Sequence, residues 1–268
     1  MLDSNPHIVA ILQARMSSSR LPGKVLLDLA GRPILAWSVE RARRARYVSR
    51  VVVATTTEAA DDPIVAFCQT RGYPWWRGHP YDVLDRFYQA ARHFQADVIV
   101  RITADCPLVD PELIDVTVEA LLQQGADFAA NRLPPPWRRT YPIGLDVEVC
   151  TFQALERAWR EAQAPHQREH VMPYLYEVEG RFRTVILNAE KDYGQVRWTV
   201  DTPQDLEVVR KLVALLGGRD DFTWREALAV WQAHPELATL NAQVRHHTYT
   251  DVDERFGGQD TTEPGVST

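Results

Sequence analysis

The sequence has few cysteines and no long apolar segment. Its 268 residues include three cysteines, and no two of these have the spacing of zinc ligands. Such an odd and sparse set excludes a disulfide framework and is typical of a reducing compartment. The first apolar run, residues 8–12, is too short for a signal-peptide core or a membrane span, and no later window qualifies. We therefore expect a cytoplasmic protein that does not enter a membrane.

An excess of positive charge is also missing. The net charge is −6 at pH 7, whereas proteins that bind nucleic acids or membrane surfaces usually carry a basic face. We therefore expect no nucleic-acid partner, although a local basic pocket is compatible with this charge. Two glycine-rich phosphate-binding patterns are absent as well, the G-x-x-x-x-G-K-[ST] loop and the G-x-G-x-x-G turn. Their absence argues against a P-loop ATPase and a dinucleotide-dependent dehydrogenase.

Short apolar runs alternate with amphipathic segments in the first half of the chain. Helices are expected at residues 33–45, 61–72, 82–94 and 111–124, and buried strands at 8–12, 51–54 and 98–102. This alternation predicts an α/β protein with a Rossmann-like three-layer αβα fold and a mostly parallel mixed sheet. Ligands bind such sheets beyond the carboxyl ends of the strands.

The second half of the chain has a different pattern. We expect one domain over residues 1–250, in which about 133–195 form a small antiparallel arm on the acceptor side that is used in dimerisation. Further segments are assigned as loop (134–139), strands (145–149, 182–187, 195–200) and helices (152–162, 167–178, 203–216, 224–244). Residues 257–268 are rich in Gly, Thr and Ser without an apolar period, which predicts a disordered tail.

A basic loop, residues 14–24, follows the first predicted strand. It carries Arg15, Arg20 and Lys24 among serines. A triphosphate needs dispersed positive charge and close backbone donors, which arginine, lysine and small residues supply. The alternative, an ordinary solvated basic loop, stays open on the charges alone.

Two aspartates follow apolar segments in a similar way. Asp105 comes directly after the strand at 98–102 and therefore lies at the ligand-binding edge of the sheet. Asp201 either caps the following helix or is free, because Thr202 and Asp205 together can form a capping box. A magnesium–nucleotide complex takes one or two carboxylates from a protein, and both aspartates suit that role.

Residues 11–37 resemble the opening of the cytidylyltransferase family, which includes acylneuraminate and 3-deoxy-manno-octulosonate cytidylyltransferases. The SpsF-like spore-coat polysaccharide branch is the most similar, with the pattern QARxxSxRLPGKxL. The chain matches this pattern at Gln13, Ala14, Arg15, Ser18, Arg20, Leu21, Pro22, Gly23, Lys24 and Leu26. The resemblance continues to about Arg210, and the helices beyond it have no assigned role.

The resemblance implies a nucleotidyltransferase fold in which the basic loop holds the triphosphate of CTP. It further implies that Asp105 and Asp201 bind Mg²⁺, the expected cofactor. Residues 77–86 resemble a family segment, RGxxxDVLxR, that lies beside the base and ribose. Three residues, Arg15, Lys24 and Asp105, are assigned as catalytic. The nucleotide-binding set is Gln13, Ala14, Arg15, Ser18, Arg20, Gly23, Lys24, Gly78, Asp82, Arg86, Thr103 and Asp105.

Two further segments resemble the acceptor side of the family. Asp146 and Glu148 alternate with apolar residues and point to one face of a strand, where they either bind sugar hydroxyls or form an ordinary solvent face. Arg168 and His170 lie in a segment, REHV, that would suit an acceptor carboxylate. His170 is alternatively a structural residue in a dimer contact.

The resemblance therefore implies a magnesium-dependent cytidylyltransferase. It would transfer CMP from CTP to a small acidic sugar of the nonulosonate or ulosonate type, for surface polysaccharide or glycan synthesis, and would act as a homodimer. One alternative is a nucleotidyltransferase that uses another nucleotide or a non-sugar acceptor. The other is a non-catalytic nucleotide-sugar binding module, which the combination of Lys24, Asp105 and Asp201 disfavours.

Overall fold

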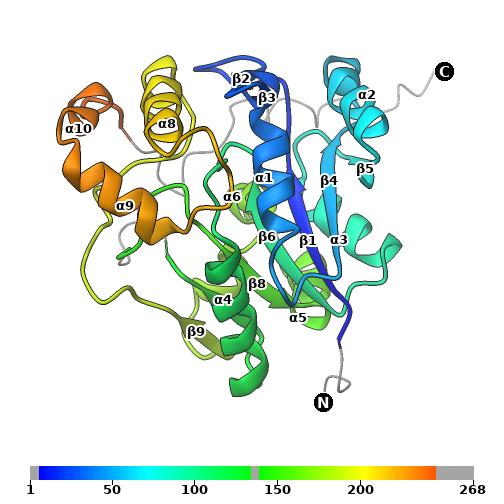
Figure 1. Cartoon of the computed structure of the whole chain (residues 1–268). Coiled ribbons are helices and arrows are strands. Elements are labelled where there is room, and N and C mark those ends of the chain that lie inside the picture. The colour runs from blue at the N-terminus through cyan, green and yellow to red at the C-terminus, as the bar shows by residue number, and fades with distance from the viewer. Residues whose placement is uncertain (1–5, 134–138, 246–268) are drawn as a thin grey trace.

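A mixed sheet of seven strands forms the centre of the molecule (Figure 1). The computed structural model describes residues 6–133 and 139–245. Across the sheet the strands are β5 (Trp75–Gly78), β4 (Arg50–Thr56), β1 (Ile8–Gln13), β6 (Val98–Thr103), β8 (Glu148–Thr151), β7 (Phe128–Ala130) and β9 (Thr184–Ile186).

Only β8 runs against its neighbours. It pairs antiparallel with β6 and with β7, whereas the other neighbouring pairs are parallel. A separate antiparallel pair joins β2 (Asp28–Leu29) to β3 (Arg32–Pro33). The predicted mostly parallel sheet with a small antiparallel part is thus confirmed. Because β5, β4, β1 and β6 are parallel, the residues that follow them meet at one edge of the sheet.

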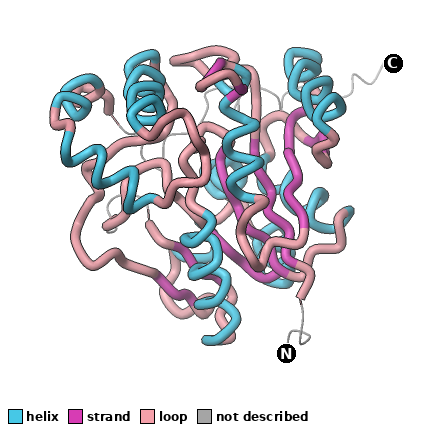
Figure 2. The backbone as a smooth tube through the Cα atoms, viewed as in Figure 1, coloured by secondary structure: helices cyan, strands magenta, loops and turns pink. Residues whose placement is uncertain are grey.

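Helices cover both faces of this sheet (Figures 1 and 2). One face is covered by α1 (Ile34–Ala42), α2 (Asp62–Arg71), α4 (Pro111–Gln124), α8 (Pro203–Leu215), α9 (Trp224–Ala233) and α10 (Glu236–Leu240). The other is covered by α3 (Val83–His93), α5 (Phe152–Glu161), α6 (Pro165–His170) and α7 (Pro173–Tyr176). Two 3₁₀ turns, η1 (Lys24–Leu26) and η2 (Ala59–Asp61), lie near the ligand edge. The predicted three-layer αβα arrangement is confirmed.

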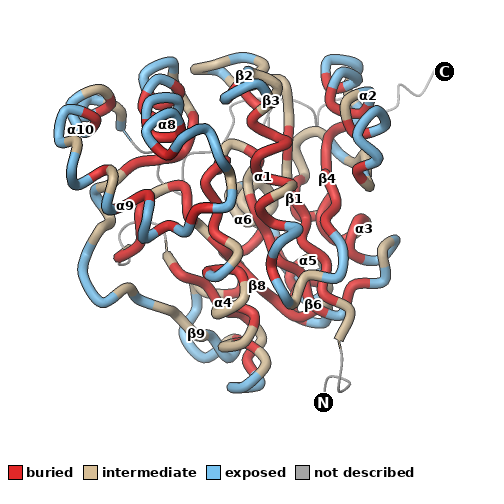
Figure 3. The backbone as a smooth tube through the Cα atoms, in the orientation of Figure 1, coloured by how far each residue is buried: buried red, intermediate tan, exposed pale blue. Residues whose placement is uncertain are grey.

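Strand β1 shows why the central strands are continuous apolar runs. Ile8, Ala10 and Leu12 pack into one core cluster, while Val9 and Ile11 pack into the cluster on the opposite face. A strand covered on both sides needs apolar residues at every position rather than at alternate ones. The sheet is accordingly buried along most of its length (Figure 3).

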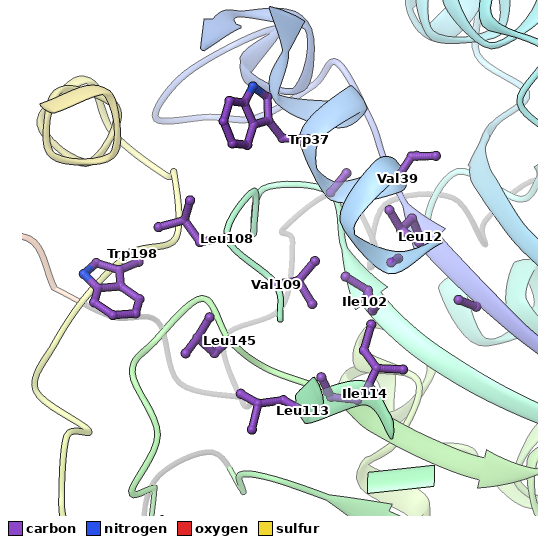
Figure 4. Close-up of a cluster of buried hydrophobic side chains, with 14 of the residues drawn as sticks. Leu12, Trp37, Val39, Ile102, Leu108, Val109, Leu113, Ile114, Leu145 and Trp198 are labelled. Carbon is purple, nitrogen blue, oxygen red and sulfur yellow. The ribbon is translucent and has the colours of Figure 1, made fainter. Parts of the chain in front are cut away.

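The larger core cluster continues past the sheet towards the C-terminal helices (Figure 4). Leu12 of β1 and Ile102 of β6 contribute to it, as do Trp37 of α1 and Ile114 of α4. Trp198 extends the cluster towards α9, where its ring meets that of Trp231 edge-on at 6.1 Å. The helices that had no assigned role therefore share one hydrophobic core with the sheet.

Three segments differ from the prediction because prolines or close backbone contacts intervene. The helix expected at 167–178 is broken at Val171, whose φ is +71°, and at Pro173. The helix expected at 224–244 is broken at Pro235, between α9 and α10. The strand expected at 145–149 begins only at Glu148, as β8.

The predicted strand at 195–200 is wrong. Only Arg197 forms a bridge, with Ile143. The backbone hydrogen bonds of this segment go to loops instead, as when Trp198 N–H donates to the Ile143 carbonyl at 2.7 Å and Val200 N–H to the Asp105 carbonyl at 2.9 Å. Without a neighbouring strand to pair with, the segment cannot extend the sheet.

Two strands of the seven-stranded sheet were missed from the sequence, as was the short pair of β2 and β3. β5 reads WWRG, with an arginine and a glycine, and β7 has three residues. Both are shorter than a run whose periodicity identifies a strand. Residues 134–138 of the predicted loop at 134–139, and the predicted tail at 257–268, lie outside the described residues. Within the described ranges, every helix is too short or too polar to cross a membrane.

Gly144 provides a test of how tightly the 195–200 segment is held. Its φ is +102°, and a Cβ there would lie 2.5 Å from the Thr199 backbone nitrogen. We expect Gly144→Ala to lower the free energy of unfolding by about 3 kcal/mol or more, because strain and collision add. Gly180→Ala is the matched control, since its φ is +74° but nothing lies within 4 Å of the added atom. Equal losses in urea unfolding of the two variants would show that the contact at Gly144 has no cost.

Candidate active site

The loop after β1 folds back on itself through backbone hydrogen bonds. The Met16 carbonyl accepts from the N–H groups of Ser18 and Gly23, both at 2.9 Å. Gly23 has a φ of +70°, in the left-handed region that glycine adopts most easily. The turn brings Lys24 inward at the start of η1, and only 8% of that residue is exposed.

A buried carboxylate, that of Asp61, anchors the same loop. It accepts from the Met16 N–H at 2.7 Å and from both the backbone N–H and the hydroxyl of Thr56. Thr56 is the last residue of β4, so Asp61 ties the loop after β1 to the end of the neighbouring strand. In the sequence Asp61 marks only the start of a predicted helix, and nothing in its local pattern distinguishes it.

Lys24, Asp105 and Asp201 form one cluster. The Lys24 Nζ lies 2.6 Å from Asp105 Oδ2 and 2.7 Å from Asp201 Oδ1. The structure therefore brings together the three residues that the sequence analysis assigned to phosphate and metal binding. Both aspartates keep part of their surface open to solvent, with side-chain exposures of 21% and 16%.

The electrostatics of the cluster favour the charged forms of Lys24 and Asp201. Burial alone would lower the pKa of Lys24, but the carboxylates of Asp105 and Asp201 outweigh it and raise that pKa. Burial would likewise raise the pKa of Asp201, yet Lys24, Arg20 and Arg197 lower it. Asp201 thus remains an anion well below neutral pH.

Asp201 has two further cationic partners. Arg20 Nη2 lies 3.2 Å from its Oδ2, and Arg197 Nη2 lies 2.7 Å from the same oxygen. Thr202 and Asp205 form the capping box of α8, which leaves the Asp201 side chain to face the site as expected. Arg197 was not identified from the sequence, where it stands in an apparent strand.

Arg86 of α3 is buried, with 2% of its surface exposed. Its Nε and Nη1 have no hydrogen-bond partner among the described residues. Burial and the nearby charge of Arg15 lower the pKa of Arg86 to about 10, against the opposing effect of Asp61 and other acids. A buried guanidinium with unused donors costs folding free energy, and an oxygen-bearing ligand could satisfy those donors.

Gly78 allows β5 to approach α3 closely. A Cβ at this position would lie 2.9 Å from Arg86 Cγ and 3.2 Å from its Cα. The small residue thus lets the strand pack against the backbone of the helix at Arg86. Gly78 and Arg86, both assigned to nucleotide binding, are direct neighbours.

Asp82 and Arg168 meet, although they were assigned to opposite ends of the reaction. Asp82 caps α3 by accepting from the Asp85 N–H at 2.9 Å, and Arg168 Nη2 lies 2.5 Å from Asp82 Oδ2. The guanidinium also donates to the Trp159 carbonyl at 2.7 Å. The contact joins the predicted base-side segment to the predicted acceptor-side segment. His170 is the last residue of α6 and is half-buried.

Asp146 and Glu148 are both neutralised by arginines. Arg139 Nη1 lies 2.5 Å from Asp146 Oδ1, and Arg101 pairs with Glu148. Arg132 lies between them, 3.6 Å from Asp146 and 3.8 Å from Glu148. The two carboxylates do face the same side. They bind arginine side chains there rather than forming a solvent face, since Glu148 is 3% exposed.

The remaining predicted residues lie at the ends of β1 and β6. Gln13 and Thr103 are paired in register as the last residues of the two strands. The Gln13 side chain accepts from Arg101 Nε at 3.1 Å, which links the end of β1 to the arginines around Asp146 and Glu148. Ala14 is buried and donates its N–H to Ala54 at 3.0 Å.

The donor set near Lys24 suits a hard divalent cation. Asp105 and Asp201 direct carboxylate oxygens at one point, the Lys24 ammonium. In the described ranges no group of three or more His, Cys, Asp or Glu side chains gathers at one place. A metal here would take two carboxylates from the protein and complete its shell with phosphate oxygens and water, as Mg²⁺ does at nucleotides.

The geometry agrees with the result of comparing the chain with known families. The model of the family described as Cytidylyltransferase matches residues 9–230. The chain belongs to the cytidylyltransferase family. The resemblance seen at residues 11–37 is thereby confirmed, and the chain is a nucleotidyltransferase.

Individual relatives cover nearly all of the described fold. The spore coat polysaccharide biosynthesis protein SpsF of Bacillus subtilis (strain 168) is 34% identical over 239 residues, 87% of this chain and 97% of that protein. A 3-deoxy-manno-octulosonate cytidylyltransferase of Anaeromyxobacter dehalogenans (strain 2CP-C) is 30% identical, covering 78% of this chain and 98% of that enzyme. A solved cytidylyltransferase structure from Leptospira borgpetersenii covers 90% of this chain with 31% identity and a TM-score of 0.82.

The lowered pKa of Asp201 predicts an acid-dependent stability. A carboxyl whose pKa is depressed by folding stabilises the protein above its unfolded pKa, about 4, and loses that contribution as the pH falls through its folded value. Asp201→Asn should therefore cost most at pH 7 and progressively less below about pH 4. Urea unfolding from pH 7 to pH 3 would measure this, with Glu207→Gln, an exposed pair partner of Lys211, as the control. A loss that is the same at every pH would contradict the assigned charge state.

Proposed function

We propose that the protein transfers CMP from CTP to a small acidic sugar, with Mg²⁺ as cofactor and pyrophosphate as the second product. The observation that supports this most directly is the contact of the Lys24 Nζ with both Asp105 and Asp201. It supports the proposal because a lysine suited to bind phosphate and two carboxylates suited to bind a metal meet at the carboxyl edge of one sheet. Family membership supports the same type of transfer.

In the proposed reaction, an acceptor oxygen attacks the α-phosphorus of CTP. A new P–O bond forms, the bond to the oxygen that bridges the α- and β-phosphates breaks, and pyrophosphate leaves with that electron pair. Arg15, Arg20 and Lys24 neutralise the growing negative charge on the leaving group. When bound, Mg²⁺ held by Asp105 and Asp201 would withdraw charge from the phosphate oxygens.

Positioning is the main work left to the protein. Lys24 is fixed by the turn at Gly23 and by two ion pairs, so its ammonium is already oriented before a nucleotide binds. Donors held in place beforehand cost little reorganisation during the reaction. The unused donors of Arg86, beside Gly78, support a nucleotide position between the basic loop and β5.

The acceptor side carries an excess of arginine. Arg101, Arg132 and Arg139 surround two carboxylates, Asp146 and Glu148, so the cluster has one more positive than negative charge. Such a surplus favours an acceptor with its own carboxylate. Two relatives are named for spore-coat polysaccharide biosynthesis and for 3-deoxy-manno-octulosonate, which supports an acidic sugar destined for a surface polysaccharide. A homodimer and a cytoplasmic location complete the proposal.

The nucleotide and metal requirements can be tested with pyrophosphate release. The protein is supplied with CTP, ATP, GTP or UTP, a panel of ulosonic and nonulosonic acids, and either Mg²⁺ or EDTA. We expect turnover with CTP and Mg²⁺ only. Asp105→Asn should reduce kcat about 100-fold, because a metal-ligating oxygen is lost at the phosphates.

Glu119→Gln is the control and should retain full activity, because Glu119 is a partly exposed residue of α4 whose carboxylate accepts from Gln123. Equal turnover of all four nucleotides would refute the preference for CTP. Full activity of Asp105→Asn would refute its metal role, and turnover with a neutral alcohol alone would refute the acidic acceptor.

Replacing Arg86 should raise the free energy of unfolding and weaken the binding of CTP. Arg86→Met removes a buried charge with unused donors, so the free protein should gain about 1–3 kcal/mol in unfolding free energy. The same change should raise the KM for CTP about tenfold, because a ligand contact is lost. Arg92→Met, at an exposed position of the same helix, controls for the substitution itself. A destabilised Arg86→Met with unchanged KM would make Arg86 a structural residue.

A further inference from the structure

After α10, the last helix of the described ranges, the chain returns to the candidate active site. Leu237 of α10 is 1% exposed and belongs to the larger core cluster, and α10 packs against α8. The family match ends at residue 230, so α10 and residues 241–245 lie beyond it. Figure 1 shows α10 beside α8, the helix that Asp201 precedes.

Asn241, directly after α10, is buried with 6% of its surface exposed. Its Nδ2 donates two hydrogen bonds, to the Arg197 carbonyl at 3.2 Å and to Asp205 Oδ1 at 3.0 Å. Both acceptors lie in the segment that carries Asp201. One amide group thus donates to a backbone carbonyl and to a side-chain carboxylate of this segment.

Asp205 in turn forms hydrogen bonds with Asp201 and with its partner Arg197. It is fully buried, and its Oδ2 accepts from the Asp201 N–H at 3.1 Å and from Arg197 Nη2 at 3.1 Å. The same Arg197 nitrogen donates to Asp201 Oδ2 at 2.7 Å. Asp205 and Arg197 therefore fix both the backbone and the carboxylate of Asp201.

The chain after Asn241 makes a second contact with the site. The Arg245 carbonyl accepts from Arg20 Nη1 at 3.4 Å, while Arg20 Nη2 lies 3.2 Å from Asp201. Residues 241–245 therefore approach Asp201 from two sides, through Asp205 and Arg197 on one and through Arg20 of the basic loop on the other.

We propose that Asn241 is a positioning residue of the active site. It acts through Asp205 and Arg197 to hold the Asp201 carboxylate against Lys24, and it touches no substrate itself. This inference rests on the proposed role of Asp201 and gives the C-terminal segment a function in that site. Buried hydrogen-bonded networks of this kind fix one arrangement, because a member that loses its partner is left unsatisfied.

The expected effect is on the rate more than on nucleotide affinity. Most cations that meet the triphosphate belong to the basic loop, which Asn241 does not contact. A displacement of about 1 Å at a group that acts in the transition state can cost up to a hundredfold in rate. We expect Asn241→Leu to lower kcat about tenfold and to change the KM for CTP less than twofold.

Two variants and a control test the proposal. Asn241→Leu keeps the volume and removes the amide, and Asn241→Ala removes both. Thr239→Ala is the matched control, since it deletes one exposed side-chain hydrogen bond from α10 and leaves the network intact. The first readout needs no substrate: hydrogen exchange of the Asp201 and Thr202 amides should rise at least tenfold in both Asn241 variants and stay unchanged in Thr239→Ala.

The second readout is the kcat and KM of CTP-dependent pyrophosphate release. Unchanged amide exchange at Asp201 and Thr202 in both Asn241 variants would overturn the proposal, whatever the activity. Faster exchange with wild-type kcat would overturn it as well, because the network would then have only a structural role. If the wild-type protein is inactive but exchange is faster in the variants, the proposed function is refuted. The role of Asn241 in holding Asp201 through Asp205 and Arg197 would still be supported.

Discussion

The ion cluster of Lys24, Asp105 and Asp201 is the interaction on which the site depends. Asp105 lies 81 positions and Asp201 lies 177 positions after Lys24 in the chain. Three separate segments must therefore be in place before the cluster forms. A buried ammonium is tolerated only where opposite charges compensate for its lost hydration. The parallel strands β1 and β6 supply this condition, because they deliver Lys24 and Asp105 to one edge of the sheet.

The other buried charged groups of the site differ in whether their hydrogen-bonding atoms have partners. Asp61 and Asp205 are buried and fully occupied by donors, and each holds a loop that carries a functional residue. Arg86 is the opposite case, a buried cation whose donors are only partly used. Satisfied groups give the site its rigidity, whereas the unused donors of Arg86 would be satisfied by the nucleotide under the proposed function.

The sequence predicts the nucleotide half of this molecule better than the acceptor half. A continuous apolar run such as β1 is recognised as a buried strand from the sequence alone, and the loop with Lys24 has a long ungapped family pattern. Asp61 and Asn241 carry no such signal, because their roles depend on residues that only the folded chain brings near. The false strand at 195–200 has the same cause: its apolar alternation is real, but its backbone partners are the loops at Ile143 and Asp105 rather than a strand.

The reversed direction of β8 brings a different kind of connection to the ligand edge. In the parallel strands this edge is reached by the residues that follow each strand, whereas in β8 it is reached by those that precede it, with Glu148 opposite Arg101. The connection entering β8 also packs on the segment that leads to Asp201, since the Ile143 carbonyl accepts from the Trp198 N–H and Gly144 lies against Thr199. A change in the length of that connection would therefore reach the ion cluster of Lys24, Asp105 and Asp201 as well as the arginines around Asp146 and Glu148.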